Sequence, residues 1–284
     1  IIALLVLISL LLSLSGCGLF RKSQDETNLE SSPDVAEQVQ SNMRKTVFYF
    51  VNESDLLVPV TREIPWVEGI GRAALESLVD TPELRAELAE KGLKPSLPAG
   101  TQIIGMTIRD GLAKVDFNEN FLNNDSKIAE YNAIQSVVYT LGEFPTLDRV
   151  QILVNGKPLK KCPHGTELGD VLYPEKINLE PTNNPLSGAV PVTLFFKSYS
   201  SDGNYSYFVP VTRMVPQSDD LIKTAVEELI KGPSPEMDLV ATLPQDAKVL
   251  DVIRDESHVI VNFSKEIEGY GGGLDAEQTL VDSV

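Results

Sequence analysis

The chain contains few of the residue types on which metal centres and many active sites depend. Among its 284 residues there are two histidines, two cysteines and one tryptophan. A metal ion in a protein needs three or four ligands gathered at one place, whereas His164 and His258 are far apart in the sequence. We therefore expect no metal ion and no cofactor.

Basic residues are also scarce. The chain has 24 lysines and arginines against 41 aspartates and glutamates, which gives a formal net charge of −17 at pH 7. Because nucleic-acid binding depends on positive charge that neutralises phosphates, this balance argues against a nucleic-acid partner. An acidic surface most often serves solubility, and an acidic recognition face is the alternative.

The sequence lacks a hydrophobic run that is long enough to span a bilayer. Residues 1–16, IIALLVLISLLLSLSG, carry no charge, but a membrane helix needs roughly 20 apolar residues. The segment has the composition of the apolar region of a secretory signal peptide. A membrane helix that extends further upstream is the alternative.

The residues that follow indicate a lipid anchor. Leu14-Ser15-Gly16-Cys17 resembles the bacterial lipobox, in which the cysteine carries diacylglycerol and the signal peptide is cut before it. The resemblance implies that Cys17 is lipidated and holds the protein on the extracytoplasmic face of the cell membrane, since two acyl chains anchor stably. A plain signal peptide with a nearby cysteine is the alternative.

Cys162 is the only other cysteine, so the mature chain is expected to form no internal disulfide. It belongs to Cys162-Pro163-His164, a pair of metal-ligand types, but no further ligand types cluster around it in the sequence. We interpret Cys162 as a cysteine of a linker.

One stretch of the sequence occurs twice in nearly the same form. VPVTREIP at 58–65 recurs as VPVTRMVP at 209–216, and the flanking VFYF at 47–50 corresponds to VTLFF at 192–196. The flanks have the β-branched and aromatic composition of strands. The two copies lie 151 positions apart, which is the size of a whole domain and predicts a tandem duplication of one domain. We interpret the repeated octapeptide as structural rather than as a duplicated binding site.

These patterns divide the chain into five parts. We expect a lipoprotein signal peptide at 1–16, the lipidated cysteine and a flexible tether at 17–45, a first domain at 46–156, an interdomain linker at 157–190 and a second domain at 191–284. The linker either packs on a domain or lets the domains swing. The second domain is expected to be incomplete at its C-terminus, because AEQTLVDSV stops at Val284 whereas its counterpart AEYNAIQSVV continues to Gly156.

Each domain is predicted to have the order ββαββαβ. In the first copy we expect strands at 46–52 and 56–62, a helix from about 68, a hairpin that turns at 109–111, a helix after Ser126 and a last strand in DRVQILVNG. The fold class is α+β, with a mixed sheet and two helices on one face of it in each domain. Helical spacing predicts three buried stripes: Val67, Ile70, Ala74, Leu75 and Leu78; Ala133, Ile134, Val137, Val138 and Leu141; and, after a cap in 218–220, Ile222, Ala225, Val226, Leu229 and Ile230.

The two copies do not share a set of catalytic residues. His258 has no histidine counterpart in the first copy, and Asp116 aligns with Asn262, an amide that cannot act as an acid or base. Gly271-Gly272-Gly273 lacks the Lys-Ser/Thr of a phosphate-binding loop. We therefore expect no enzyme, although a glycosidase pair among the many carboxylates is an alternative that spacing cannot dismiss.

Several segments together carry a family resemblance. The run LIKGPSPEMDLVATLPQDAKVLDVIRDESHVIVNFSKEI, with Leu243-Pro244 and VNFS, resembles the GerMN domain of sporulation and spore-germination lipoproteins. The first copy is similar in LPAGT at 97–101, VDFN at 115–118 and VQILVNGKPL, although Asp80-Thr81-Pro82 stands where Gly-Pro is usual. With the lipobox, the tether and HGTELGDVLYPEKIN, the chain is identified as a GerM-like lipoprotein with two tandem GerMN domains.

The resemblance implies a non-enzymatic role in sporulation and spore germination. GerM-like lipoproteins help to position the complex that links mother cell and forespore, so we expect envelope or sporulation-complex proteins and the membrane as partners. Cys17 is the one position that matches a defined functional residue of the family. Oligomerisation, and which face binds partners, are left open. The alternative is an envelope lipoprotein that binds a ligand, a cell-wall fragment or a sensor protein outside sporulation.

Overall fold

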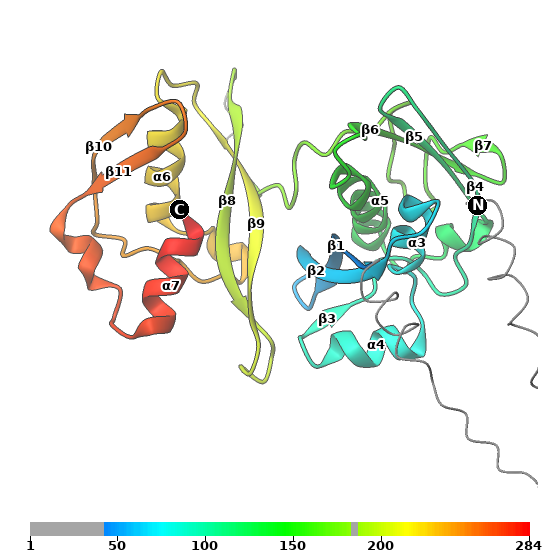
Figure 1. The fold of residues 1–284 in the computed structure, drawn as a ribbon, viewed down its shortest axis with the longest axis horizontal. Coiled ribbons are helices and arrows are strands. Elements are labelled where there is room, and N and C mark those ends of the chain that lie inside the picture. Colours follow the sequence, from blue (N-terminus) through cyan, green and yellow to red (C-terminus); the bar gives the residue numbers. More distant parts are fainter. Residues whose placement is uncertain (1–42, 183–186) are drawn as a thin grey trace, which may run out of the picture. The chain divides into compact units, whose positions relative to one another are not determined.

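The computed structural model describes residues 43–182 and 187–284. The predicted signal peptide, Cys17 and most of the predicted tether lie outside these residues. Within them the predicted α+β class and the tandem organisation are confirmed. Figure 1 shows both copies, each with strands and helices in layers.

The first copy begins with a long antiparallel hairpin. Strand β1 (Met43–Asn52) pairs with β2 (Leu57–Pro65) from Met43 to Val51, and the short β3 (Leu93–Lys94) pairs with the end of β1. The sheet order β2-β1-β3 leaves β2 at an edge. Pro59, which has no N–H to donate to a ladder, therefore lies on an edge strand, where proline is tolerated.

A second, mixed sheet follows. Strands β4 (Ile103–Arg109) and β5 (Leu112–Phe117) form the predicted hairpin, and its two turn residues Asp110 and Gly111 both have positive φ, as a tight hairpin turn requires. Strand β6 (Arg149–Val154) pairs with β5 in parallel, and β7 (Lys157–Pro158) closes the sheet. The strands of the first copy thus form two sheets.

Helices α3 (Ile70–Glu76) and α5 (Lys127–Gly142) supply the core of the first copy. The predicted stripe of α5 is confirmed, because all five of its residues are at most 2% exposed. The stripe of α3 is confirmed for Ala74 and Leu75, and Leu78 is buried just beyond the helix end. The prediction was wrong for Val67, which is 44% exposed because α3 begins only at Ile70.

A further helix, α4 (Pro82–Ala89), was not predicted. Thr81 caps it by accepting a hydrogen bond from the backbone N–H of Leu84, and Pro82 occupies the first turn, where its missing N–H costs nothing. Only Leu84 and Leu88 are buried on it. Two apolar residues are too few to produce a clear helical period, although the Thr-Pro-Glu start was a usable signal.

The second copy repeats the sequence of hairpin, helix, hairpin and helix, without counterparts of α4, β3, β6 and β7 in the described residues. A hairpin of β8 (Val190–Tyr199) and β9 (Ser206–Val215) precedes α6 (Leu221–Lys231), and a second hairpin of β10 (Val249–Arg254) and β11 (Val259–Phe263) precedes α7 (Leu274–Ser283). Helix α6 lies between the two hairpins (Figure 1). Asp220 caps α6 within the predicted segment by accepting from the N–H of Lys223.

Small polar side chains on α5 complete the open edge of β1. Ser136 Oγ donates to the carbonyl of Tyr49 at 2.6 Å, and Thr140 Oγ1 accepts from the N–H of the same residue at 3.3 Å. Ser96 Oγ lies 2.7 Å from Ser136 Oγ. These buried hydroxyls satisfy backbone groups that would otherwise lie unpaired in the core.

The segment after β7 packs rather than running free. The backbones of Leu172 and Val150 exchange two hydrogen bonds. Further on, the buried Asn178 accepts from the N–H of Leu57 and donates to the carbonyls of Leu57 and Pro210, all at 2.8 Å. Packing was one of the two alternatives that the sequence left for this linker.

Candidate functional site

The two copies contain a groove at the same place in the fold. Three corresponding segments line each one: a loop that ends in Leu-Pro, the loop before the second helix and the first turns of that helix. Groove 1, in the first copy, has a volume of about 470 Å³ and groove 2, in the second, about 360 Å³. Leu97-Pro98 and Leu243-Pro244 occupy corresponding places in the two walls. Concave sites of this size are where ligands and peptide segments bind.

Groove 1 is lined by ion pairs and amides. Arg85 pairs with Asp80 at 2.6 Å, and Lys94 pairs with Asp55 at 3.2 Å. Asn132, on α5, donates to the backbone carbonyl of Asp55 at 2.8 Å and so fixes that rim. The pairs are solvent-exposed, so they add little stability and are available to a polar partner.

Groove 2 has a different lining, centred on a buried lysine. The side chain of Lys197 is 7% exposed, and its ammonium donates to Asp275 Oδ2 at 3.0 Å and to Thr279 Oγ1 at 2.8 Å. It also lies 5.5 Å from the ring centroid of Tyr199, a cation–π distance. Tyr270 lines the same groove.

The polar groups of one groove are not repeated in the other. Thr279 stands where the first copy has Asn132, Asp275 where it has Ile128, and Lys197 where it has the apolar Val51. A reaction common to both copies would need the same groups in both. The shared shape with different side chains favours two recognition sites of different specificity.

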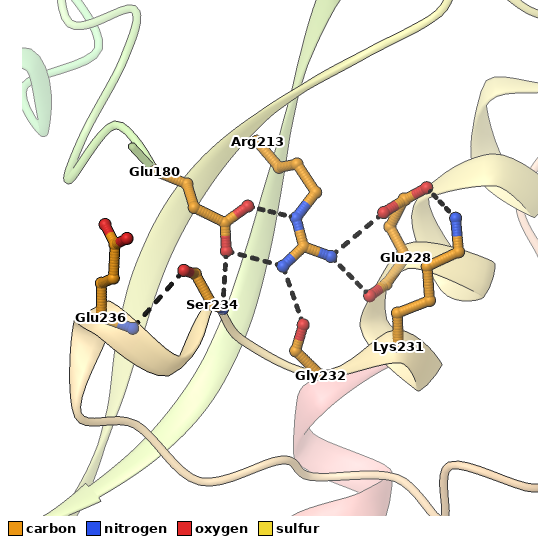
Figure 2. Close-up of polar contacts among 7 residues, drawn as sticks. All are labelled: Glu180, Arg213, Glu228, Lys231, Gly232, Ser234 and Glu236. Carbon is orange, nitrogen blue, oxygen red and sulfur yellow. Dashed lines mark hydrogen bonds and ion pairs between the residues drawn. The ribbon is translucent and has the colours of Figure 1, made fainter. Parts of the chain in front are cut away.

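Figure 2 shows a polar cluster of the second copy around Arg213 on β9. Its guanidinium forms a two-pronged pair with Glu180 at 2.5 and 2.6 Å, and it donates to a carboxylate oxygen of Glu228 at 3.1 Å and to the carbonyl of Gly232 at 2.7 Å. The side chains of Arg213, Glu180 and Glu228 are 13%, 11% and 14% exposed. Glu180 belongs to the interdomain segment, so the cluster ties that segment to α6.

Arg213 is the arginine of the repeated octapeptide, and Arg62 is its counterpart. Arg62 pairs with Glu87 on α4 at 2.7 Å and lies over the rings of Phe48 and Phe50, as Arg213 lies over Phe196. Both arginines therefore cover aromatic rings of the preceding strand and hold a neighbouring element by a carboxylate. This common role supports the structural interpretation of the repeat.

The Cys162-Pro163-His164 turn closes over a buried carboxylate. Glu130, on α5, is 1% exposed and accepts the backbone N–H groups of His164 at 2.5 Å and of Thr166 at 3.2 Å. Burial raises the pKa of Glu130, but the hydrogen bonds outweigh it and hold that pKa below its ordinary value. Burial, with the charge of Glu130, raises the pKa of the Cys162 thiol to about 11. The turn has a structural role, and the burial and raised pKa of its thiol disfavour the reactive thiolate.

We predict that Glu130→Gln opens this turn. A glutamine amide presents N–H groups to one of two backbone donors, and a buried donor without a partner costs about 1–3 kcal/mol. In a Cys17→Ser background, Cys162 should then react roughly ten-fold faster or more with a disulfide reagent, since each 1.4 kcal/mol is about a factor of ten. Glu277→Gln, at the corresponding exposed position of α7, should leave the rate unchanged, and an equal rate for both variants would contradict the assignment.

The same carboxylate should give the first copy a pH dependence. The folded-state pKa of Glu130 is lowered from 4.5, so its stabilising contribution is complete above about pH 4.5 and is lost as the pH falls through the folded-state pKa. Thermal unfolding should therefore show that the difference between wild type and Glu130→Gln shrinks below that pH. A constant difference down to pH 3 would contradict this.

The remaining predicted candidates lie apart from one another. His258 is in the exposed turn between β10 and β11, and Asp116 accepts the N–H of Gly156 at 2.9 Å. Gly271-Gly272-Gly273, all with positive φ, forms the loop before α7. In residues 43–182 and 187–284 no three metal-binding side chains gather, and no helix has the length and apolar composition to cross a bilayer.

Comparison with known proteins decides the family. The family described as "Germane: Sporulation and spore germination" matches residues 47–160 and 193–284. The chain is also 30% identical over 290 aligned positions to the spore germination protein GerM of Bacillus subtilis (strain 168), covering 91% of this chain and 78% of GerM. The chain belongs to the GerM family.

Solved structures place the GerM-family fold over most of the chain. The tandem GerMN domains of the sporulation protein GerM from Bacillus subtilis superpose with a TM-score of 0.71 at 31% identity, covering 80% of this chain and 81% of that one. The first GerMN domain of the same protein, solved alone, covers 46% of this chain at 32% identity, with a TM-score of 0.42. The suspected relationship and the two tandem GerMN domains are thus confirmed.

Proposed function

We propose that this GerM-family chain is a lipid-anchored, extracytoplasmic interaction module that helps to position an envelope complex during sporulation and germination, without catalysis. The observation that carries the proposal is the pair of grooves at equivalent places with different linings. A duplicated fold that keeps a cavity but changes its polar groups suits two different protein contacts better than one chemical reaction.

The anchor is proposed to be Cys17, which holds the two copies at the membrane surface. Cys17→Ala should lose the fatty-acid label and keep its signal peptide uncut, because cleavage at a lipobox requires the acylated cysteine. The measurement is metabolic labelling of sporulating cells of the source organism by a fatty-acid analogue, with electrophoresis to show whether the signal peptide is cut. Labelled, cleaved Cys17→Ala protein would overturn the anchor.

Partner binding is tested by a matched pair of groove variants. Asn123→Arg in groove 1 and Tyr270→Arg in groove 2 place a bulky cation at corresponding sites in the loops before α5 and α7. Each should remove a different subset of the envelope proteins that co-purify with the wild type from membranes of sporulating cells. Glu63→Arg, at an exposed position of β2, is the control and should remove none.

The outcomes separate the proposal from its alternative. Recovery of sporulation-complex proteins that depends on the grooves supports the scaffold role. Recovery of only vegetative wall or sensor proteins, together with normal sporulation after deletion of the gene, would favour an envelope lipoprotein that acts outside sporulation. Cleavage of peptidoglycan by the pure protein would contradict the non-catalytic role.

A further inference from the structure

The first copy carries an exposed apolar patch where the described chain begins. Trp66, the only tryptophan of the protein, is 56% exposed, and Met43 and Val67 beside it are 38% and 44% exposed. Arg44 lies 5.1 Å from the ring centroid of Trp66 and equally far from that of the buried Phe144. We name Met43, Arg44, Trp66 and Val67 the Trp66 patch.

The fold does not need these apolar side chains at the surface. In the second copy the octapeptide is followed by Gln217 and Ser218 where the first has Trp66 and Val67. Both residues of the second copy are exposed and polar, and the same hairpin and helix form around them. Because the duplicated domain folds with either pair, Trp66 and Val67 are better explained by binding than by folding.

The patch lies at the N-terminal end of the described residues, which follows the predicted anchor Cys17 in the sequence. Met43 pairs with Pro65 in the β1–β2 ladder, so the first described residue is next to Trp66. Between Cys17 and Met43 the sequence has 25 residues, 18–42, and a chain of that length reaches at most about 80–90 Å. A patch at this position stays within reach of a membrane that holds Cys17.

We infer that the Trp66 patch binds the lipid surface of the membrane to which Cys17 attaches the protein; this rests on the proposed anchor. Tryptophan favours the interface between headgroups and acyl chains, where its ring is buried and its N–H stays wet. The stacked Arg44 holds the ring and can reach lipid phosphates. The contact is weak alone, and the tether makes it effective by raising the local lipid concentration.

The charges around the patch allow such a contact. Lys45 lies opposite Glu63 in the ladder, and Glu68 follows Val67, so Arg44 is offset by nearby acids. The patch therefore has no strong positive field, and its binding should depend on the apolar side chains rather than on anionic lipid. Phosphatidylcholine and mixed phosphatidylcholine–phosphatidylglycerol vesicles should then give similar results.

The test attaches the chain to vesicles chemically. The protein from residue 17 onward is coupled through the Cys17 thiol to a maleimide lipid, while Cys162, 5% exposed, is protected. Brominated lipids then probe Trp66, whose emission is the only tryptophan signal. We expect a blue shift and a loss of emission intensity with brominated lipid when the protein is coupled, and neither when it is free and dilute.

A reporter at the equivalent position of the second copy is the control. The double variant Trp66→Gln, Gln217→Trp moves the tryptophan to that position, and the coupled protein should show no loss of emission with brominated lipid. Equal loss at both positions, or none at Trp66, would overturn the proposal. A blue shift that grows with protein concentration before lipid is added would also overturn it and assign the patch to self-association.

Because the lipid is attached chemically, this experiment does not depend on lipidation in the cell. A failure of the Cys17 anchor in cells would leave the emission result unchanged. Conversely, an unquenched Trp66 in coupled protein would remove the membrane contact while leaving the anchor and the grooves untouched. The two proposals can therefore fail separately.

Discussion

Replacing Arg213 with methionine is expected to destabilise the second copy by about 3–5 kcal/mol, because it leaves two buried carboxylates without their cation. Glu180 and Glu228 are 11% and 14% exposed, and neither keeps a comparable partner: Glu180 would retain the N–H of Ser234, and Glu228 would retain the exposed Lys231. The buried ion pairs add little net stability. Removing the arginine is nevertheless destabilising, because the two carboxylates then stay buried without a cation that compensates for their desolvation.

Arg62→Met is the matched control, at the same place in the repeated octapeptide. Arg62 and Glu87 are 27% and 43% exposed, so water reaches this pair more than it reaches the Arg213 pairs. The loss of the pair, together with the contacts to Phe48 and Phe50, should cost at most about 1–2 kcal/mol. Denaturant unfolding followed by circular dichroism measures both. Hydrogen exchange should place the effect of Arg213→Met in β9, α6 and the segment around Glu180, and equal costs for the two variants would contradict this account.

Phe117→Ala should cost about 3–5 kcal/mol, the usual range for removal of a fully buried aromatic ring. Phe117 is fully buried and stacks on Phe121 with ring centroids 4.4 Å apart. Its counterpart Phe263 on β11 is only partly buried, so less apolar area returns to water when it is truncated. Denaturant unfolding should therefore show a clearly smaller loss for Phe263→Ala.

Equal losses of stability for the two phenylalanine variants would contradict this prediction. If Phe263→Ala costs as much as Phe117→Ala, the packing around β11 in solution is as close as that around β5. Because a chain of two domains need not unfold in one step, each variant should be read from the transition of its own copy. Trp66 reports on the first copy, and its fluorescence separates the two transitions.

Periodic apolar patterns made the core of both copies predictable. The stripe of α5 from Ala133 to Leu141 and that of α6 from Val226 to Ile230 face inward as their 3.6-residue spacing requires. The Asp110-Gly111 turn was also predictable from the sequence, because these residue types readily adopt the positive φ that a two-residue hairpin turn needs. Local chemistry alone decides such features.

Features that depend on distant residues were not predictable. Ser136 and Thr140 break the apolar pattern of α5, and only the edge of β1 at Tyr49, 87 and 91 residues away, explains them. The partner of Arg213 in the interdomain segment, Glu180, is 33 residues away in the chain. A sequence pattern does not contain such pairings, because they arise when separate elements pack.

The two grooves were also not predictable from the sequence, because they depend on residues that are distant in the chain. Each is formed by three segments that meet only in the fold, and the candidate residues that the sequence suggested, such as His258 and Cys162, line neither. The signal that could have pointed to them is the repeat itself: Leu97-Pro98 and Leu243-Pro244 keep the wall, while Asn132 and Thr279 change the lining. Comparing the two copies position by position separates what the fold needs from what each copy adds.

The measurement that tests the central claim most directly is site-specific photo-cross-linking in sporulating cells. A photoreactive amino acid is placed at Asn123 in groove 1, at Tyr270 in groove 2 and at Glu63 outside both. We expect protein adducts from both grooves, with different partners for each, and none of these adducts from Glu63. The same adducts at all three positions, or no protein adduct from either groove, would contradict the claim that the two copies act as a pair of interaction sites.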